Sequence, residues 1–141
     1  MRRFLAVFTF LICLALLPTP ARAACTNATL SGTYGFHEQG QAIGEGFSQF
    51  RGVGTLTFDG KGNATGPFTL WYSNLTVAEG QLHILYTVNS NCTFTYTYVE
   101  NGETFTGTIV GNGGQYFYLE TTGDPMRSGE AVKITVGQNK Q

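Results

Sequence analysis

The chain has 141 residues, enough for one domain and short for two. Only 12% of the residues are charged, about half the usual share, while 42% are hydrophobic, 13% are aromatic and 19 are glycine. So many aromatic side chains with so little charge exclude a disordered chain. Eight basic against nine acidic residues leave no positive surplus for a nucleic-acid partner.

The first 23 residues have the order of a secretory signal peptide. A basic start precedes an apolar run of 14 residues from Phe4 to Leu17, and Ala21-Arg22-Ala23 supplies a small-residue cleavage site. A retained membrane anchor is the alternative, but this run is shorter than the roughly 20 residues that span a bilayer. We therefore expect cleavage after Ala23, no stable membrane insertion afterwards, and a secreted or periplasmic protein.

The mature chain, residues 24–141, is expected to form a single domain. It holds five basic and nine acidic residues, a net charge of −4. Cys13 leaves with the signal peptide, so Cys25 and Cys92 remain, and an even number of cysteines in an oxidising compartment predicts a disulfide bond. Two free thiols or a metal pair is the weaker alternative, because neither cysteine has a histidine at ligand spacing. No metal and no cofactor are assigned.

Apolar and polar residues alternate along most of the mature chain, which is typical of half-buried β-strands. No window of helical length shows a 3.6-residue apolar period. A further strand is expected through Gly44 to Phe50. The eight clearest strands are Gly32–Phe36, Val53–Phe58, Phe68–Tyr72, Gln81–Val88, Thr93–Val99, Thr104–Val110, Gln115–Thr121 and Ala131–Val136.

Two Asn-Gly pairs predict tight hairpins, because both central residues of a type I′ turn take positive φ. A turn at Asn101-Gly102 pairs Tyr98 with Phe105 and places Tyr96 over Gly107. It puts aromatic residues on one face and threonine pairs on the other, as in a stable register.

The second turn, at Asn112-Gly113, extends the same aromatic face to a third strand. It pairs Ile109 with Tyr116, Gly107 with Tyr118, and Phe105 with Glu120.

Short antiparallel strands joined by sequential hairpins predict an all-β fold, a single meander closed into a small up-and-down β-barrel of about eight strands. A β-sandwich is the alternative. Such a barrel either fills with side chains or holds one small ligand.

Three segments also resemble a group of small exported bacterial proteins of unknown function. They are Leu30-Ser31-Gly32-Thr33-Tyr34-Gly35-Phe36, the hairpin from Gly52 to Asn63, and Tyr86-Thr87-Val88 followed by Asn91-Cys92-Thr93. These proteins open with Cys and a Gly-Thr-Tyr-Gly-Phe-like strand and continue with a Gly-x-Leu-Thr-Phe-Asp-Gly-x-Gly-Asn hairpin. The resemblance implies a shared fold and carries over no catalytic residue. By architecture alone, the barrel is also similar to lipocalin and allene-oxide-cyclase-like barrels.

Glu38 and Glu120 are the most informative polar residues, because each shares a strand face with tyrosines and lies near a strand end. The preferred interpretation is two rim carboxylates in water, because acidic groups are rarely buried unpaired. If those faces are interior instead, the two carboxylates meet near a barrel mouth, where they could do acid–base work or orient a polar ligand. The candidate ligand-binding residues are Tyr34, Glu38, Tyr96, Tyr98, Tyr116, Tyr118 and Glu120.

Three functions remain open. A barrel that binds a small apolar or amphipathic ligand is preferred, because a tyrosine-rich interior suits a pocket. A structural or cell-surface interaction protein is the second, supported by threonine rows and by Trp71-Tyr72. An isomerase or cyclase that uses Glu38 and Glu120 is the third. No catalytic residue is assigned, since His37 and His83 have no partners that would form a catalytic group. The oligomeric state is left open.

Overall fold

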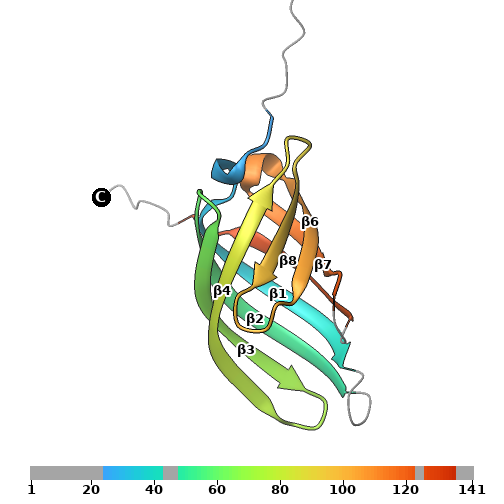
Figure 1. Ribbon diagram of the computed structural model, residues 1–141. Coiled ribbons are helices and arrows are strands. Elements are labelled where there is room, and N and C mark those ends of the chain that lie inside the picture. The colour runs from blue at the N-terminus through green and yellow to red at the C-terminus, as the bar shows by residue number, and fades with distance from the viewer. Residues whose placement is uncertain (1–23, 43–47, 123–125, 136–141) are drawn as a thin grey trace, which may run out of the picture.

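The computed structural model describes residues 24–42, 48–122 and 126–135. Eight antiparallel strands form a closed barrel in which each strand pairs with the next in the chain and the last pairs with the first (Figure 1). The strands are β1 (Ser31–Ala42), β2 (Ser48–Asp59), β3 (Asn63–Tyr72), β4 (Val77–Val88), β5 (Thr93–Tyr98), β6 (Thr104–Val110), β7 (Gln115–Glu120) and β8 (Met126–Lys133). The predicted up-and-down barrel is confirmed, and the alternative sandwich is wrong.

Several strands are longer than the alternation predicted. The expected strand from Gly44 to Phe50 is not a separate element: Ser48 to Phe50 begin β2, and residues 43–47 lie outside the described part of the chain. At the other end, β8 begins at Met126 rather than Ala131. Arg127, Gly129 and Ala131 therefore lie on the same face of β8, and this face is the one toward the barrel interior. The earlier start of β8 thus brings an arginine into the interior.

The two predicted hairpins have different outcomes. The β6–β7 register is confirmed in all three pairs. The β5–β6 register is wrong by two residues, since Tyr96 pairs with Phe105 rather than with Gly107. The reason is a wider loop, in which the Tyr98 N–H donates to the Glu103 carbonyl (2.9 Å) and the Glu103 N–H donates to Asn101 Oδ1 (3.0 Å).

A shift of two residues leaves every side chain on its predicted face, because side chains alternate with a period of two. Phe94, Tyr96 and Tyr98 are therefore buried as expected, and threonines pair on the outer face. What changes is the packing partner: Phe94, not Tyr96, covers Gly107.

Aromatic rings fill the middle of the barrel. Tyr96 stacks on Phe105 with ring centroids 4.5 Å apart, and Phe94 meets Tyr116 edge to face at 5.2 Å. Such pairs add roughly 0.5–1.5 kcal/mol each beyond the burial of their area. The largest fully buried side chains are Tyr34, Tyr116, Phe94, Phe105, Leu30 and Ile84.

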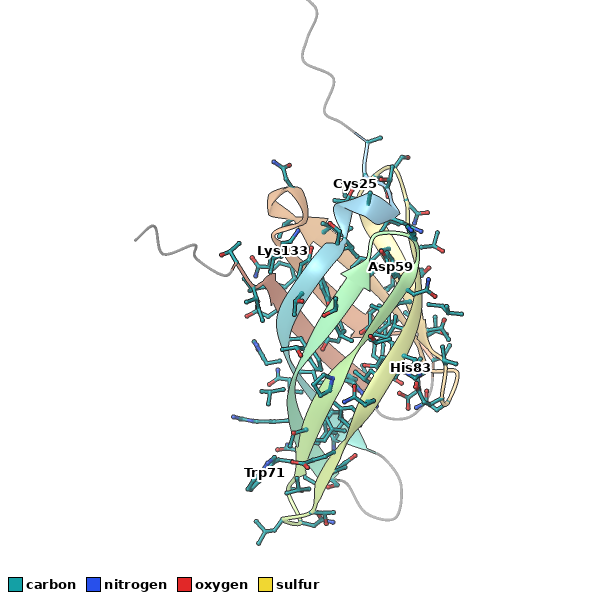
Figure 2. The ribbon with its side chains drawn as sticks, turned by 90° about the vertical axis from the view of Figure 1, so that its left-hand side faces the viewer. Cys25, Asp59, Trp71, His83 and Lys133 are labelled. Atoms are coloured by element: carbon teal, nitrogen blue, oxygen red, sulfur yellow. A yellow bond between two sulfur atoms is a disulfide. The ribbon has the colours of Figure 1, made fainter. Side chains whose placement is uncertain are left out.

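One end of the barrel is closed by the short helices η1 (Asn27–Thr29) and η2 (Gly111–Gly113) (Figure 1). The predicted disulfide between Cys25 and Cys92 is formed there, with Cα atoms 5.0 Å apart, and is consistent with an oxidising exported compartment. Figure 2 shows Cys25 at this end of the barrel. A buried hydroxyl also forms a hydrogen bond at this end, since the Tyr86 hydroxyl donates to the Leu30 carbonyl at 2.9 Å.

The predicted signal peptide, residues 1–23, lies outside the described residues, among which no helix is long and apolar enough to cross a membrane.

The opposite end is uneven. Strands β1 to β4 have 10 to 12 residues, whereas β5 to β7 have six or seven. The ladder between β4 and β5 runs only from Ile84 to Val88, so the first half of β4 extends past the end of β5. Figure 1 shows the β3–β4 hairpin projecting beyond the β5–β6 loop. This unevenness leaves the interior open at the mouth of the barrel.

Candidate functional site

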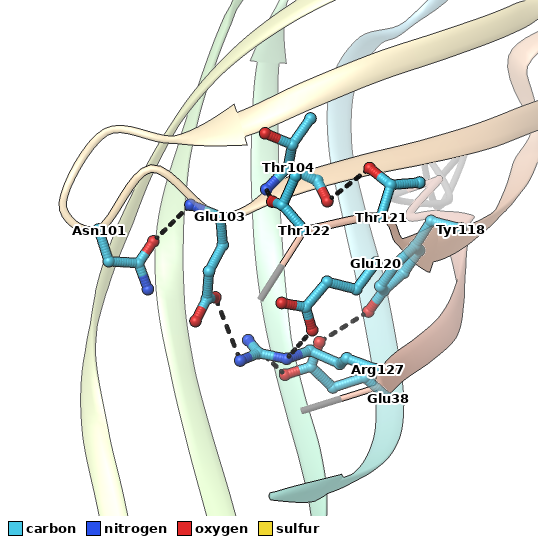
Figure 3. A network of polar contacts seen from close by, with 9 residues as sticks. All are labelled: Glu38, Asn101, Glu103, Thr104, Tyr118, Glu120, Thr121, Thr122 and Arg127. Carbon is cyan, nitrogen blue, oxygen red and sulfur yellow. Dashed lines mark hydrogen bonds and ion pairs between the residues drawn. The ribbon is translucent and has the colours of Figure 1, made fainter. Parts of the chain in front are cut away.

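A buried arginine lies at the mouth among three carboxylates (Figure 3). Arg127 Nη2 is 3.2 Å from Glu103 Oε2, Nε is 3.6 Å from Glu120 Oε2, and Nη1 is 3.9 Å from Glu38 Oε1. The Arg127 side chain is only 11% exposed. We call Arg127, Glu38, Glu103 and Glu120 the mouth cluster.

Strand register brings these groups together from four parts of the chain. Glu38 lies in β1 opposite Gly129 of β8, two residues after Arg127. Glu120 ends β7, and Glu103 directly precedes β6. Because Gly129 has no side chain, the Tyr118 ring packs against its backbone. From there the Tyr118 hydroxyl donates to Glu38 Oε2 at 3.1 Å.

The mouth cluster is negative in balance, with three carboxylates against one guanidinium. Burial raises the pKa of Glu38, while Arg127 and the Tyr118 hydroxyl act in the opposite direction. Aromatic rings also stabilise the cation, since Arg127 Cζ lies 5.3 Å from the ring centroid of Phe50.

A pocket of about 410 Å³ opens above the cluster, within the range of small-ligand sites. Its floor carries Glu38, Glu103 and Arg127. The β5–β6 loop adds Glu100 and Asn101 at the rim. The opposite wall is apolar and comes from the projecting hairpin: Phe68 and Leu70 of β3 with Ala78 and Leu82 of β4.

The structure divides the predicted ligand-binding residues into three groups. Glu38 and Tyr98 line the pocket, and Glu120 and Tyr118 support the cluster beneath it. The remaining three, Tyr34, Tyr96 and Tyr116, pack in the filled part of the barrel. The interior is thus neither wholly filled nor hollow, because rings occupy its middle and space remains at one end.

Sequence reasoning missed Arg127 and Glu103. Gly123-Asp124-Pro125 is recognisable as a turn, and a strand starting directly after it would have placed Arg127, Gly129 and Ala131 on the interior face. Glu103 is expected beside a tight turn, but the wider β5–β6 loop directs it toward the mouth. No sequence signal indicates the wider loop.

The carboxylates of the enzyme hypothesis and the two histidines lie in separate ion pairs. Both carboxylates that the enzyme hypothesis requires are ion-paired with Arg127. The histidines lie elsewhere, on the outer face: His37 Nδ1 is 3.8 Å from Glu130 and His83 Nδ1 is 3.2 Å from Glu100. Among the described residues, no group of three or more His, Cys, Asp or Glu side chains is arranged to hold a metal ion.

Comparison with protein-family models and with curated proteins finds no match. Among solved structures, the chain is similar to a designed protein described as "De novo design of a fluorescence-activating beta barrel". The two are 19% identical over 75% of this chain and 94% of that chain, with a TM-score of 0.42. A similarity this low carries no argument about function.

Proposed function

We propose that the protein is an exported binding protein that takes a small amphipathic ligand with a cationic group into the mouth of its barrel. The observation that carries this proposal is the pocket of about 410 Å³ with an apolar wall and a carboxylate-rich floor. An apolar body fits against Leu70 and Leu82, while a protonated amine fits the excess of carboxylates beside Arg127.

Charge balance selects the cationic group. Arg127 neutralises only one of the three carboxylates around it, and the pocket rim adds Glu100. An anionic ligand would meet like charges in a site of low dielectric, where repulsion is stronger than in water. A cation instead completes the neutralisation.

The test compares three ligands that share one alkyl chain: octylamine, octanol and octanoate. Calorimetric titration is expected to show binding in the order octylamine, octanol, octanoate, with the amine at least about tenfold tighter than the acid. Equal affinity for octylamine and octanoate would contradict the proposal.

A matched pair of variants locates the binding. Ala78→Phe fills the pocket from the inner face of β4, whereas Val77→Phe adds the same side chain to the neighbouring exposed position. We expect octylamine binding to be lost in Ala78→Phe and kept in Val77→Phe. Binding that survives in both variants would place the ligand elsewhere.

An interaction role for the outer surface is the second candidate. Trp71 is 59% exposed and pairs across the strands with Arg51, which in turn pairs with Gln39. A tryptophan in such a row is a frequent contact residue at protein interfaces. The enzyme hypothesis is not proposed, because Arg127 accounts for both of its carboxylates.

A further inference from the structure

The projecting half of β4 has one free edge. Its residues from Val77 to Leu85 pair with β3 on one side, whereas β5 pairs with β4 only from Ile84 onward. His83 is the last residue of this half to be satisfied on the β5 side: its carbonyl accepts from the Val99 N–H at 2.9 Å, and its N–H donates to Glu100 Oε1 at 3.1 Å. Within the described part of the chain, no strand pairs with this edge from Val77 to Leu82.

Backbone alternation tells which residues point to the edge. The N–H and C=O of one strand residue point to the same side, and successive residues alternate. The Tyr86 N–H donates to Gly62, on the β3 side, and the groups of His83 lie on the β5 side. Gln81 and Glu79 therefore direct their backbone donors and acceptors outward from the free edge, beside the mouth pocket.

We propose that an extended peptide segment with a basic side chain binds this protein by adding a strand to the free edge of β4. Peptide recognition by strand addition takes affinity from main-chain hydrogen bonds and specificity from pockets for alternate side chains. This inference rests on the proposed function, because the basic side chain is the cationic group that the pocket takes.

The register of the added strand delivers that side chain to the pocket. In an antiparallel pair, a residue opposite Gly80 lies on the same face as Gly80, which is the interior face that lines the pocket. On that face the Phe68 ring lies over Gly80 from the β3 side, and the neighbouring pocket residue of β4, Ala78, has only a methyl side chain. A lysine or arginine at that position extends toward Glu38 and Glu103 on the pocket floor.

Charge distinguishes a basic peptide from a second copy of the chain. Exposed Glu79 lies on the edge strand itself, and Glu100 and Glu103 lie at the pocket. Edge-to-edge pairing of two copies would bring these carboxylates near the same carboxylates of the other copy. Acidic side chains on an exposed edge are a known means of preventing such self-association.

The experiment uses the peptide acetyl-Thr-Val-Thr-Lys-Thr-Val-Thr-amide, whose lysine shares a face with its valines. Its partner peptides are the same sequence with glutamate in place of lysine, and the lysine peptide N-methylated at the two threonines that flank lysine. The matched protein variants are Gln81→Pro, which removes one outward N–H while leaving the β3 pairing intact, and Gln81→Ala, which keeps it.

We expect the lysine peptide to bind Gln81→Ala like the parent chain and Gln81→Pro at least about tenfold more weakly, since edge hydrogen bonds are lost. The glutamate and N-methylated peptides are expected to bind at least about tenfold more weakly to the parent chain. In the peptide complex, amide exchange at Glu79 and Gln81 is expected to slow.

Equal binding of the lysine peptide to both Gln81 variants, or of the N-methylated and unmodified peptides to the parent chain, would overturn the inference. Self-association of the parent chain that Gln81→Pro abolishes would also overturn it. Octylamine separates the two proposals: if it binds Gln81→Pro normally while the lysine peptide does not distinguish the variants, only strand addition fails. If octylamine does not bind the parent chain, the proposed function fails.

Discussion

Arg127 determines whether three carboxylates can be held together at the barrel mouth. Its guanidinium lies within 3.9 Å of Glu38, Glu103 and Glu120, and the Glu38 side chain is only 3% exposed. A buried charge that loses its partner is costly, because water no longer solvates it. The arginine thus makes a negatively charged pocket floor compatible with a stable barrel.

Arg127→Met is therefore expected to lower the free energy of unfolding by about 3 kcal/mol near neutral pH. Burial already raises the pKa of Glu38, and loss of the cation raises it further. When folding raises the pKa of a carboxyl, the folded protein loses stability as pH rises from the ordinary pKa of that group through its raised pKa. The deficit should thus be larger near pH 8 than near pH 5, as measured by urea titration at both pH values.

Arg51→Met is the control, because it removes an equal charge from the exposed outer face. It is expected to change the free energy of unfolding by less than about 0.5 kcal/mol at either pH. A deficit in Arg127→Met that does not depend on pH would mean that packing, not charge, accounts for its effect.

At the level of single residues, the sequence predicts half of the mouth cluster. Because each shares a strand face with tyrosines, Glu38 and Glu120 are singled out either as interior carboxylates or as rim carboxylates in water. Both are buried, so the preferred rim interpretation is wrong. The cation between them is not predicted, because arginine is rarely buried and the alternation starts the strand that carries it too late. A buried ion pair depends on contacts between distant strands, which local alternation does not encode.

The β5–β6 hairpin shows how far local patterns determine an element. Alternation assigns every face of this hairpin correctly, because its aromatic residues face the interior and its threonines face outward. Asn101-Gly102 alone predicts the turn, but only Gly102 of this pair has positive φ, and the loop holds four residues instead of two. The face of a side chain and the register of a strand pair are thus separate properties. Alternation predicts the face well, whereas a turn dipeptide predicts the register less well.

Two glycines of this hairpin have different roles. At Gly102, φ is +76° and an added methyl group would have nothing within 4 Å. At Gly107, an added methyl group would collide with the Phe117 carbonyl and with the Phe94 ring. Glycine is therefore needed at position 102 for its backbone conformation, and at position 107 because the Phe94 ring packs directly against the sheet.

Gly102→Ala is expected to cost about 1–2 kcal/mol, the usual penalty of a left-handed backbone for other residues. Gly107→Ala is expected to cost about 3 kcal/mol, because neither the carbonyl nor the buried ring can withdraw easily. Urea titrations of the two variants give the comparison. A larger loss in Gly102→Ala would contradict the packing of Phe94 over Gly107.

The two ends of the whole barrel are built differently. The disulfide and the short helices close one end, and the uneven strand lengths open the other. Between the two ends lies a group of buried tyrosines. Because these side chains become buried when the chain folds, folding and tyrosine protonation are coupled.

This coupling predicts how the molecule responds to alkali. Burial raises the pKa of Tyr86 to about 12 and raises the pKa values of Tyr96, Tyr116 and Tyr118 well above 10. Above pH 10 the unfolded chain releases protons that the folded chain retains, so stability falls as pH rises. We therefore expect these tyrosines to ionise together in one cooperative step, in which the absorbance change of tyrosinate coincides with loss of the β-sheet circular dichroism signal. Tyrosines that ionised gradually near pH 10 while the sheet signal remained would show that the barrel interior is open to water.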